Sequence, residues 1–273
     1  MSADPALLAQ MAALLLAIGA FAGIVAGLLG VGGGIVLVPA FFYTFSAMGY
    51  GSAQLMQVCL ATSLATIIVT SARSVQSHHR KGAVDWTILR GWAVWIGMGA
   101  VLGVLVAASL RSVVLQGIFG VLGVVIALYF GFGRNGWQLG NAMPSGVKRI
   151  VIAPFIGFLS VLMGIGGGSF GVPLMTLHGV AIHRAVATAA GFGIIIALPS
   201  VLAFMLVPIV DAPPLTIGAV NLPAFAVVVA MTLITAPLGA KLAHALDPKP
   251  LKRVFAVFIM IMALNMLRKA LGY

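Results

Sequence analysis

The sequence predicts an all-α integral membrane protein made of two inverted repeats of five segments each. Of its 273 residues, 62% are hydrophobic and only 7% are charged, whereas soluble domains carry about 25% charged residues. A spanning helix takes roughly 20 apolar residues, so the apolar positions suffice for about eight crossings. We therefore expect one compact transmembrane domain, with little of the chain left for an aqueous domain.

Ten apolar segments follow one another along the chain. Their approximate bounds are 6–29, 34–48, 54–72, 84–110, 112–133, 147–165, 168–180, 185–210, 219–243 and 251–268. Eight of them are long enough to cross a bilayer, but the second and the seventh, with about 14 residues each, fall below the roughly 17 that a span requires. We expect these two to be re-entrant or half helices.

A repeat divides the segments into two groups of five. The motif Gly30-Val31-Gly32-Gly33-Gly34 recurs 134 residues later as Gly164-Ile165-Gly166-Gly167-Gly168, and a Val-Pro pair follows each copy. The motif Gly82-Ala83-Val84-Asp85 likewise recurs 136 residues later as Gly218-Ala219-Val220-Asn221. We therefore expect a first membrane repeat at 1–133, a cytoplasmic linker at 134–146 and a second membrane repeat at 147–273.

The distribution of charge predicts how the repeats lie in the membrane. An odd number of crossings per repeat inverts the second copy, and Lys and Arg cluster in cytoplasmic loops. The loop around Arg80 and Lys81 is basic, whereas its counterpart at 211–214 has no Lys or Arg. Equivalent loops of the two copies thus differ in their content of Lys and Arg, as inversion requires. With the basic loops in the cytoplasm, we expect both termini outside. Arg268 and Lys269 near the C-terminus are the exception.

The charge balance also limits the class of function. Lys and Arg number 15 against four Asp plus Glu, but nucleic-acid binding needs a basic face on a soluble or tethered domain, and this chain offers none. The chain has no Glu, and its acids, all at segment ends or in loops, are Asp4, Asp85, Asp211 and Asp247. The absence of an acid within the apolar segments favours an anionic substrate and disfavours coupling to Na⁺ or H⁺ through a buried acid.

The two Gly-rich motifs are the candidate substrate site. We expect structural breaks in the helical pattern at Gly30, Pro39, Gly164 and Pro173. The short helix after each break begins with unpaired backbone amides and the positive end of a helix dipole, which suits an anion. Paired interrupted segments in inverted repeats are typical of transporter binding sites. The candidate substrate-binding residues are Gly32, Gly33, Gly34, Thr62, Ser63, Gly166, Gly167, Gly168, Ser169 and Thr188.

Close helix packing is the alternative explanation for the glycines. Gly23-x-x-x-Gly27 and Gly99-x-x-x-Gly103 have the small-xxx-small pattern that brings membrane helices together, and for any single pair of this kind packing is the better interpretation. For the duplicated triple glycine with its trailing proline we favour a substrate site, because packing alone requires neither feature. The hydroxyls have an alternative as well, since Ser and Thr in membrane helices often bond to carbonyls of their own helix.

No catalytic, metal or cofactor site is expected. The sequence offers no nucleophile with its base, no paired metal-ligand spacing and no cofactor loop. Residues 166–171 match a nucleotide-binding pattern, but no strand precedes them. We therefore expect a protein that is not an enzyme and that holds no cofactor or metal, rather than the rival class of a membrane enzyme or assembly subunit.

The stretch from Gly23 to Pro39, together with Ala61-Thr62-Ser63-Leu64, resembles the sulfite exporter TauE/SafE family of bacterial membrane permeases. The resemblance covers nearly the whole chain. It implies a multi-pass protein of the bacterial inner (plasma) membrane that carries small sulfur-containing anions such as sulfite, sulfonates or sulfoacetate. The family's Gly-rich signatures fall on 30–34 and 164–168, and its Thr-Ser element falls on Thr62-Ser63. In the second half Ala189 follows Thr188, so the second hydroxyl is missing there.

These features together predict a secondary transporter that moves a small sulfur-containing oxyanion by alternating access. The anion would bind near the midplane between the repeats. Its partners would be this anion and membrane lipid, without nucleic acid. An anion channel with a fixed pore between the same repeats and a carrier of a different small organic anion are the alternatives, and the oligomeric state stays open.

Overall fold

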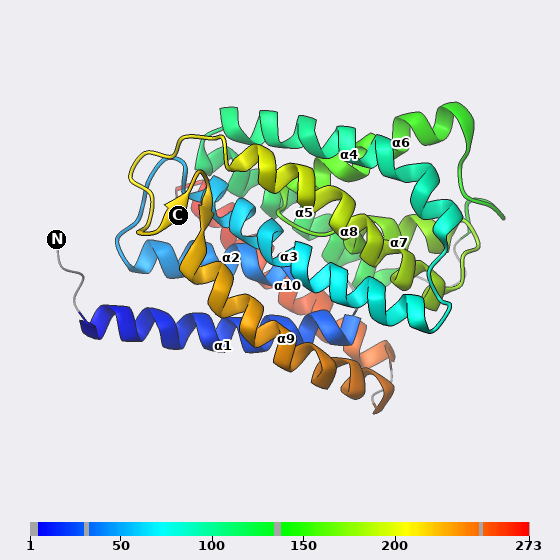
Figure 1. Cartoon of the computed structure of the whole chain (residues 1–273), viewed down its shortest axis with the longest axis horizontal. Coiled ribbons are helices and arrows are strands. Elements are labelled where there is room, and N and C mark those ends of the chain that lie inside the picture. Colours follow the sequence, from blue (N-terminus) through cyan, green and yellow to red (C-terminus); the bar gives the residue numbers. More distant parts are fainter. Residues whose placement is uncertain (1–4, 30–32, 134–137, 246–247, 273) are drawn as a thin grey trace.

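The computed structural model describes residues 5–29, 33–133, 138–245 and 248–272, which form ten helices and one short β-hairpin (Figure 1). The first five helices are α1 (Pro5–Leu29), α2 (Gly34–Ala47), α3 (Leu55–Arg80), α4 (Trp86–Ser109) and α5 (Ser112–Phe132). The second five are α6 (Gly146–Leu162), α7 (Gly168–Leu177), α8 (Ile182–Phe204), α9 (Leu222–Ala245) and α10 (Pro248–Ala270). Strands β1 (Thr216–Ile217) and β2 (Val220–Asn221) pair antiparallel between α8 and α9.

The helices follow the order of the ten predicted segments. The helices α2 and α7 begin at 34 and 168, and their 14 and 10 residues are too few to span a bilayer. Against the eight predicted crossings, five helices in the described part of the chain are long and apolar enough to cross: α3, α4, α5, α8 and residues 222–239 of α9. The chain is therefore an all-α multi-pass membrane protein.

Two helix ends and the β-hairpin differ from the prediction. The helix α3 runs past 72 to Arg80 through a polar stretch, because a helix that leaves the bilayer no longer needs apolar side chains. The helix α8 ends at Phe204 rather than near 210. Pro208 has no amide to bond the Phe204 carbonyl, which accepts the Ala219 amide at 3.0 Å. The hairpin at 216–221 was not predicted, because strands of two residues are too short to show an alternating pattern.

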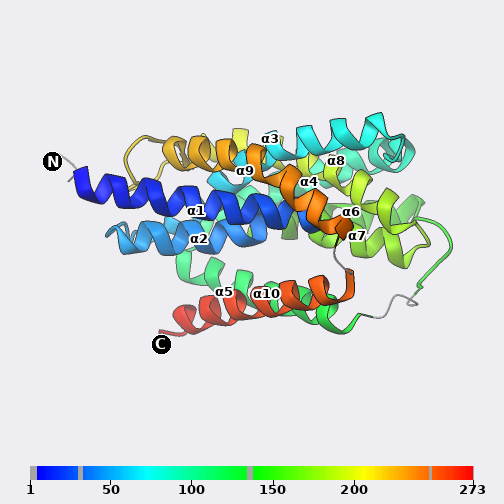
Figure 2. The ribbon, with the colours of Figure 1, turned by 90° about the horizontal axis from the view of Figure 1, so that it is seen from below.

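Four helix pairs make up the body of the bundle. The helix α1 packs along α9, α4 along α6, α5 along α10, and α3 along α8. Figure 2 shows α5 and α10 side by side at one edge. Of the five candidate spanning helices, α3 and α8 are the most buried. These two helices therefore form the centre of the molecule.

Glycines lie where the paired helices come closest. A Cβ at Gly103 of α4 would lie 2.9 Å from Val161 Cβ and 3.0 Å from Phe158 O on α6. A Cβ at Gly23 of α1 would lie 2.8 Å from Thr232 Cα on α9. Helices this close together need residues without side chains at the contact. Packing therefore accounts for Gly23 and Gly103, as the sequence pattern indicates.

The bundle has two ends, and the described chain starts and finishes at the same one. The end where α1 begins, α10 ends and the β-hairpin lies is here called the terminal end (Figures 1 and 2). The opposite end, here called the linker end, holds the α3–α4 turn (81–85) and the described part of the α5–α6 connection (138–145). Leu139 in that connection donates its amide to the Leu177 carbonyl at 2.7 Å, so the connection packs against the end of α7.

Candidate functional site

The described parts of the two Gly-rich motifs meet inside the bundle, beside α3 and α8. A Cβ at Gly34 would lie 2.6 Å from Gly164 O, so the start of α2 directly touches the α6–α7 connection. A Cβ at Gly166 would lie 3.4 Å from Ile67 on α3 and 3.6 Å from Gly193 on α8. The buried glycines of the two motifs are Gly33, Gly34, Gly164, Gly166, Gly167 and Gly168.

Each short helix begins directly after its motif. The Gly33 carbonyl accepts a hydrogen bond from the Leu37 amide at 3.0 Å, and the Gly167 carbonyl accepts one from the Gly171 amide at 2.7 Å. The first motif is described only from Gly33 onward. The candidate residues that lie outside the described residues are Gly30 and Gly32.

Gly164 is the point at which α6 ends. Its φ of +60° lies in the left-handed region that glycine adopts without steric cost. The amides of Gly164 and Ile165 donate to the carbonyls of Val161 and Ser160, both at 2.9 Å. This pair of bonds is the Schellman motif that closes many helices, so Gly164 breaks the helix as its position in the sequence predicts.

Pro39 and Pro173 do not break the chain, which corrects the sequence-based expectation. Both lie inside helices that continue past them, α2 and α7 respectively. A proline inside a helix has no amide to bond the carbonyl four residues earlier. Those carbonyls belong to Ile35 and Ser169, in the first turn of each short helix. The prolines therefore loosen the first turns without ending the helices.

Ser63 connects α3 to the second motif. Its hydroxyl donates to the Gly164 carbonyl at 2.7 Å, and its side chain is fully buried. The corresponding position in the second half is Ala189, which has no hydroxyl. Ser63 therefore bonds the first half to the second motif, and Ala189 cannot make the equivalent bond from the second half to the first motif.

Thr62 and Thr188 hold the starts of two long helices. The Thr62 hydroxyl accepts the Asn221 amide at 3.0 Å, and the Thr188 hydroxyl accepts the Asp85 amide at 2.9 Å. Asn221 and Asp85 directly precede α9 and α4. We call Thr62 with Asn221 the terminal-end clamp and Thr188 with Asp85 the linker-end clamp. Sequence reasoning did not assign either role, although the recurring Gly-Ala-Val before Asp85 and Asn221 was a signal for it.

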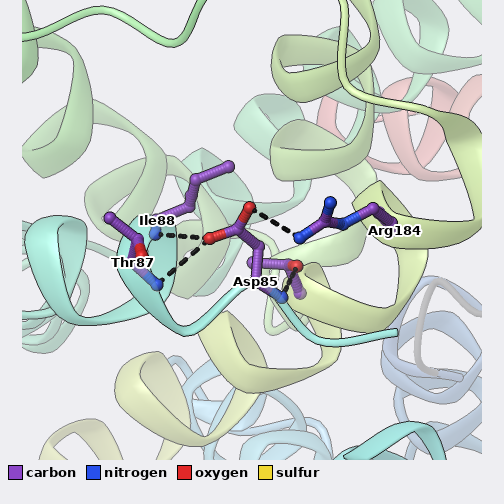
Figure 3. Close-up of polar contacts among 5 residues, drawn as sticks. Asp85, Thr87, Ile88 and Arg184 are labelled. Carbon is purple, nitrogen blue, oxygen red and sulfur yellow. Dashed lines mark hydrogen bonds and ion pairs between the residues drawn. The ribbon is translucent and has the colours of Figure 1, made fainter. Parts of the chain in front are cut away.

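The linker-end clamp includes an ion pair (Figure 3). Asp85 Oδ1 accepts the amides of Thr87 and Ile88, both at 3.1 Å, and so caps α4. Asp85 Oδ2 lies 3.1 Å from Arg184 Nη2. The Arg184 and Asp85 side chains are 56% and 23% exposed, so the pair reaches solvent. Asp85 thereby joins the start of α4 to the start of α8.

The terminal-end clamp is buried and uncharged. Asn221 is 2% exposed, and its Oδ1 accepts the Ala224 amide at 3.0 Å, near the start of α9. Its Nδ2 donates to the Pro214 carbonyl and to Thr216 Oγ1, both at 3.0 Å. Asn221 therefore joins the β-hairpin to α9 with neutral hydrogen bonds alone.

Ser169 differs from the other candidate hydroxyls. It is 2% exposed, and its Oγ has no hydrogen-bond partner within the described part of the chain. It is the second residue of α7, where helix amides and the helix dipole favour negative charge. A buried hydroxyl without a partner costs free energy. The Ser169 hydroxyl is therefore suited to a ligand that accepts a hydrogen bond.

The chemistry available at this site is that of hydroxyls and backbone amides. Within the described ranges, no group of three or more His, Cys, Asp and Glu side chains is placed to hold a metal ion. Hydroxyls and amides donate hydrogen bonds, and a helix start favours anions. This chemistry suits a small anion.

Known proteins resemble this chain over most of its length. A family model described as sulfite exporter TauE/SafE matches residues 15–266. A probable membrane transporter protein of Haemophilus influenzae is 32% identical over 260 residues, which are 94% of this chain and 98% of that protein. One of Methanocaldococcus jannaschii is 26% identical over 93% of this chain and 94% of its own length. No solved structure gives a significant match. The chain therefore belongs to the sulfite exporter TauE/SafE family.

Proposed function

We propose that this protein is a secondary transporter that moves a small sulfur-containing oxyanion, such as sulfite or an organosulfonate, by alternating access. The main support is the buried hydroxyl of Ser169, which lacks a partner among the described residues at the first turn of α7. An oxyanion at this position accepts a hydrogen bond from Ser169 and lies at the positive end of the helix. The family's name and the relatives' description as membrane transporters support transport as the class of function.

The two halves are proposed to be inverted copies of each other. Each helix of the first half has a counterpart five helices later, so that α1 corresponds to α6, α4 to α9 and α5 to α10. When every helix is replaced by its counterpart, the α1–α9 pair becomes the α6–α4 pair, and the α3–α8 and α5–α10 pairs stay the same. The exchange also converts the terminal-end clamp into the linker-end clamp, at the opposite end of the bundle. Exchange of the two ends is expected of inverted repeats in transporters.

The linker end is proposed to be cytoplasmic, with both termini on the outside of the bacterial inner membrane. The basic residues of the described helices and turns in the half toward the linker end are Arg73, Arg80, Lys81, Arg90, Lys148, Arg149, Arg184, Lys241, Lys249, Lys252 and Arg253. Those at the terminal end are Arg111, Arg268 and Lys269. An excess of Lys and Arg is typical of the cytoplasmic side.

The burial of the two motifs favours a carrier over a channel with a fixed pore. Every described glycine of the motifs is buried, and so is Ser169. An anion reaches them only after the surrounding helices move, which is the requirement of alternating access. A fixed pore would instead keep its binding groups in contact with water.

The variant Ser169→Ala tests the site. It removes a hydroxyl that has no partner in the described structure, so the thermal stability of the protein should not fall. Loss of a hydrogen bond to a charged ligand should raise the apparent KM for radiolabelled sulfite in proteoliposomes by roughly 10- to 100-fold. The matched control is Ser200→Ala, since Ser200 is equally buried but donates to Ile196 O of its own helix at 2.7 Å. Wild-type transport by Ser169→Ala would reject the proposed site.

A counterflow panel identifies the anion and separates a carrier from a channel. Proteoliposomes loaded with unlabelled anion should accumulate labelled sulfite against its gradient, because a carrier exchanges one substrate molecule for another. The panel comprises sulfite, sulfate, thiosulfate, sulfoacetate and simple carboxylates. Exchange of carboxylates alone would favour a carrier of a different organic anion, and uptake without counterflow would favour a channel.

A further inference from the structure

A long apolar groove lies on the outer surface between α5, α6 and the end of α10. Its volume is about 680 Å³, and its walls include Val114, Gly117 and Val121 of α5, Phe158 of α6, and Leu271. Val114, Val121 and Leu271 are 44%, 54% and 72% exposed. In a membrane protein such a surface faces hydrocarbon, so the groove offers a binding surface for a lipid acyl chain.

The groove has the direction and length of an acyl chain. It follows α5 from Val113, in the first turn, to Leu122. Nine residues of helix extend about 13–14 Å at 1.5 Å per residue, which is close to half of a hydrocarbon core about 30 Å thick. A groove of this length fits within a single leaflet.

Arg111 directly precedes α5, the helix along which the groove runs. It is the N-cap residue of α5 and is exposed, and it comes two residues before Val113, the first residue of α5 that lines the groove. The one ion pair among the described residues is that of Arg184 with Asp85, so Arg111 has no described carboxylate within pairing distance. A guanidinium binds phosphate oxygens through two parallel hydrogen bonds. The cation and the apolar groove together match an anionic phospholipid.

We propose that this groove binds one anionic phospholipid, with the headgroup phosphate on Arg111 and one acyl chain along α5 from Val114 to Leu122. This site is separate from the Gly-rich motifs and does not depend on the transported anion. It also gives a role to a basic residue at the terminal end, the predicted outside, where few Lys and Arg residues are expected. Arg268 lies at the same end, in the last turn of α10.

Native mass spectrometry of the full-length protein tests the proposal. The protein is released from nanodiscs that contain equal amounts of phosphatidylglycerol and phosphatidylcholine. Wild-type protein should retain phosphatidylglycerol in preference to phosphatidylcholine. Arg111→Gln should lower this preference about fivefold, the factor expected for one basic residue at an anionic lipid surface, while the total amount of bound lipid stays similar.

A second variant tests whether the groove binds an acyl chain. A Cβ at Gly117 would meet only Ala270 Cβ, at 3.9 Å, so Gly117→Leu extends into the groove without displacing the backbone. It should reduce retention of both lipids. Two controls should retain lipid as the wild type does: Arg90→Gln at the linker end, and Gly131→Leu on the same helix beyond the groove. Unchanged melting temperatures in detergent establish that the variants are folded, and Val121→Trp replaces Gly117→Leu if that variant unfolds.

Three results would overturn the proposal. The first is wild-type lipid retention by both Arg111→Gln and Gly117→Leu. The second is a dimer mass that Gly117→Leu converts to a monomer, because a second copy would then fill the groove. The third is displacement of bound lipid by glycerol phosphate at equal concentration, because the headgroup alone would then account for binding.

Discussion

The terminal-end clamp and the linker-end clamp hold equivalent helices by different chemistry. In both clamps a threonine hydroxyl of a central helix accepts the amide that precedes α9 or α4. Asn221 is buried and makes neutral hydrogen bonds, whereas Asp85 reaches solvent and pairs with Arg184. A carboxylate is tolerated at the linker end because water remains near it, while a buried charge without a partner is costly. The backbone arrangement is therefore shared, and solvent access decides the side chain.

The two short helices differ in a related way. A Cβ at Gly33 would lie 3.1 Å from Ala22 O, whereas one at Gly167 would overlap the Phe192 side chain. The second residue of α2 is Ile35, and that of α7 is Ser169. Gly167 is thus more tightly packed than Gly33, and the second residue of α7 is more polar than that of α2. This difference is the reason why we propose an anion site nearer to α7.

The largest effect is expected for alanine at Gly167, with alanine at Gly33 as the comparison. Gly167→Ala places a methyl group against Phe192 and within 3.3 Å of Ile196 Cδ1, and should destabilise the protein by about 3 kcal/mol, the upper range for overpacking. Gly33→Ala should cost less than about 1 kcal/mol, because a shift of a few tenths of an ångström relieves its contact. Thermal unfolding in mild detergent measures both. Equal losses would show that Gly33 and Gly167 are packed alike.

An intermediate effect is expected at the clamps. Asn221→Ala leaves the Pro214 carbonyl and the Ala224 amide without the side-chain partner that Asn221 provides, and it removes one of the two bonds of the Thr216 hydroxyl. It should cost about 2 kcal/mol. Asp85→Ala should cost about 1 kcal/mol, typical of a lost N-cap, since water replaces its bonds. The same unfolding assay compares the two variants. A larger loss for Asp85→Ala would contradict the contrast between a buried clamp and a solvated one.

The smallest effect is expected for the ion pair. Arg184→Gln removes the partner of Asp85 but leaves the cap in place, and an exposed pair contributes about 0–1 kcal/mol. The loss should disappear in about 1 M NaCl, where the Debye length falls to about 3 Å. Melting temperatures at low and high salt measure this dependence. If the loss of stability persisted at high salt, the ion pair would have to be shielded from solvent. That result would contradict the exposure of the Arg184 side chain.

The helices and the position of the short ones could be predicted because their signals are local. Apolar runs bounded by glycine or charge predict each helix, and the starts at 34 and 168 directly follow the triple glycines. The polar end of α3 and the β-hairpin were missed because neither has an apolar period. The prolines were misassigned as breaks, since a proline in the second turn of a helix costs one carbonyl bond and does not prevent the helix from continuing.

The sequence by itself determined the membrane class, the repeat and the residues that recur in it, because composition and spacing encode these directly. Only the tertiary structure decided what each hydroxyl does. Thr62 and Thr188 meet amides that lie 159 and 103 positions away in the chain, and Ser63 meets a carbonyl 101 positions away. A hydrogen bond needs its donor and acceptor within about 3 Å, and the packing of the central helices, not the local sequence, brings such distant groups together. Among the predicted hydroxyls that packing leaves Ser169 without a partner in the described chain.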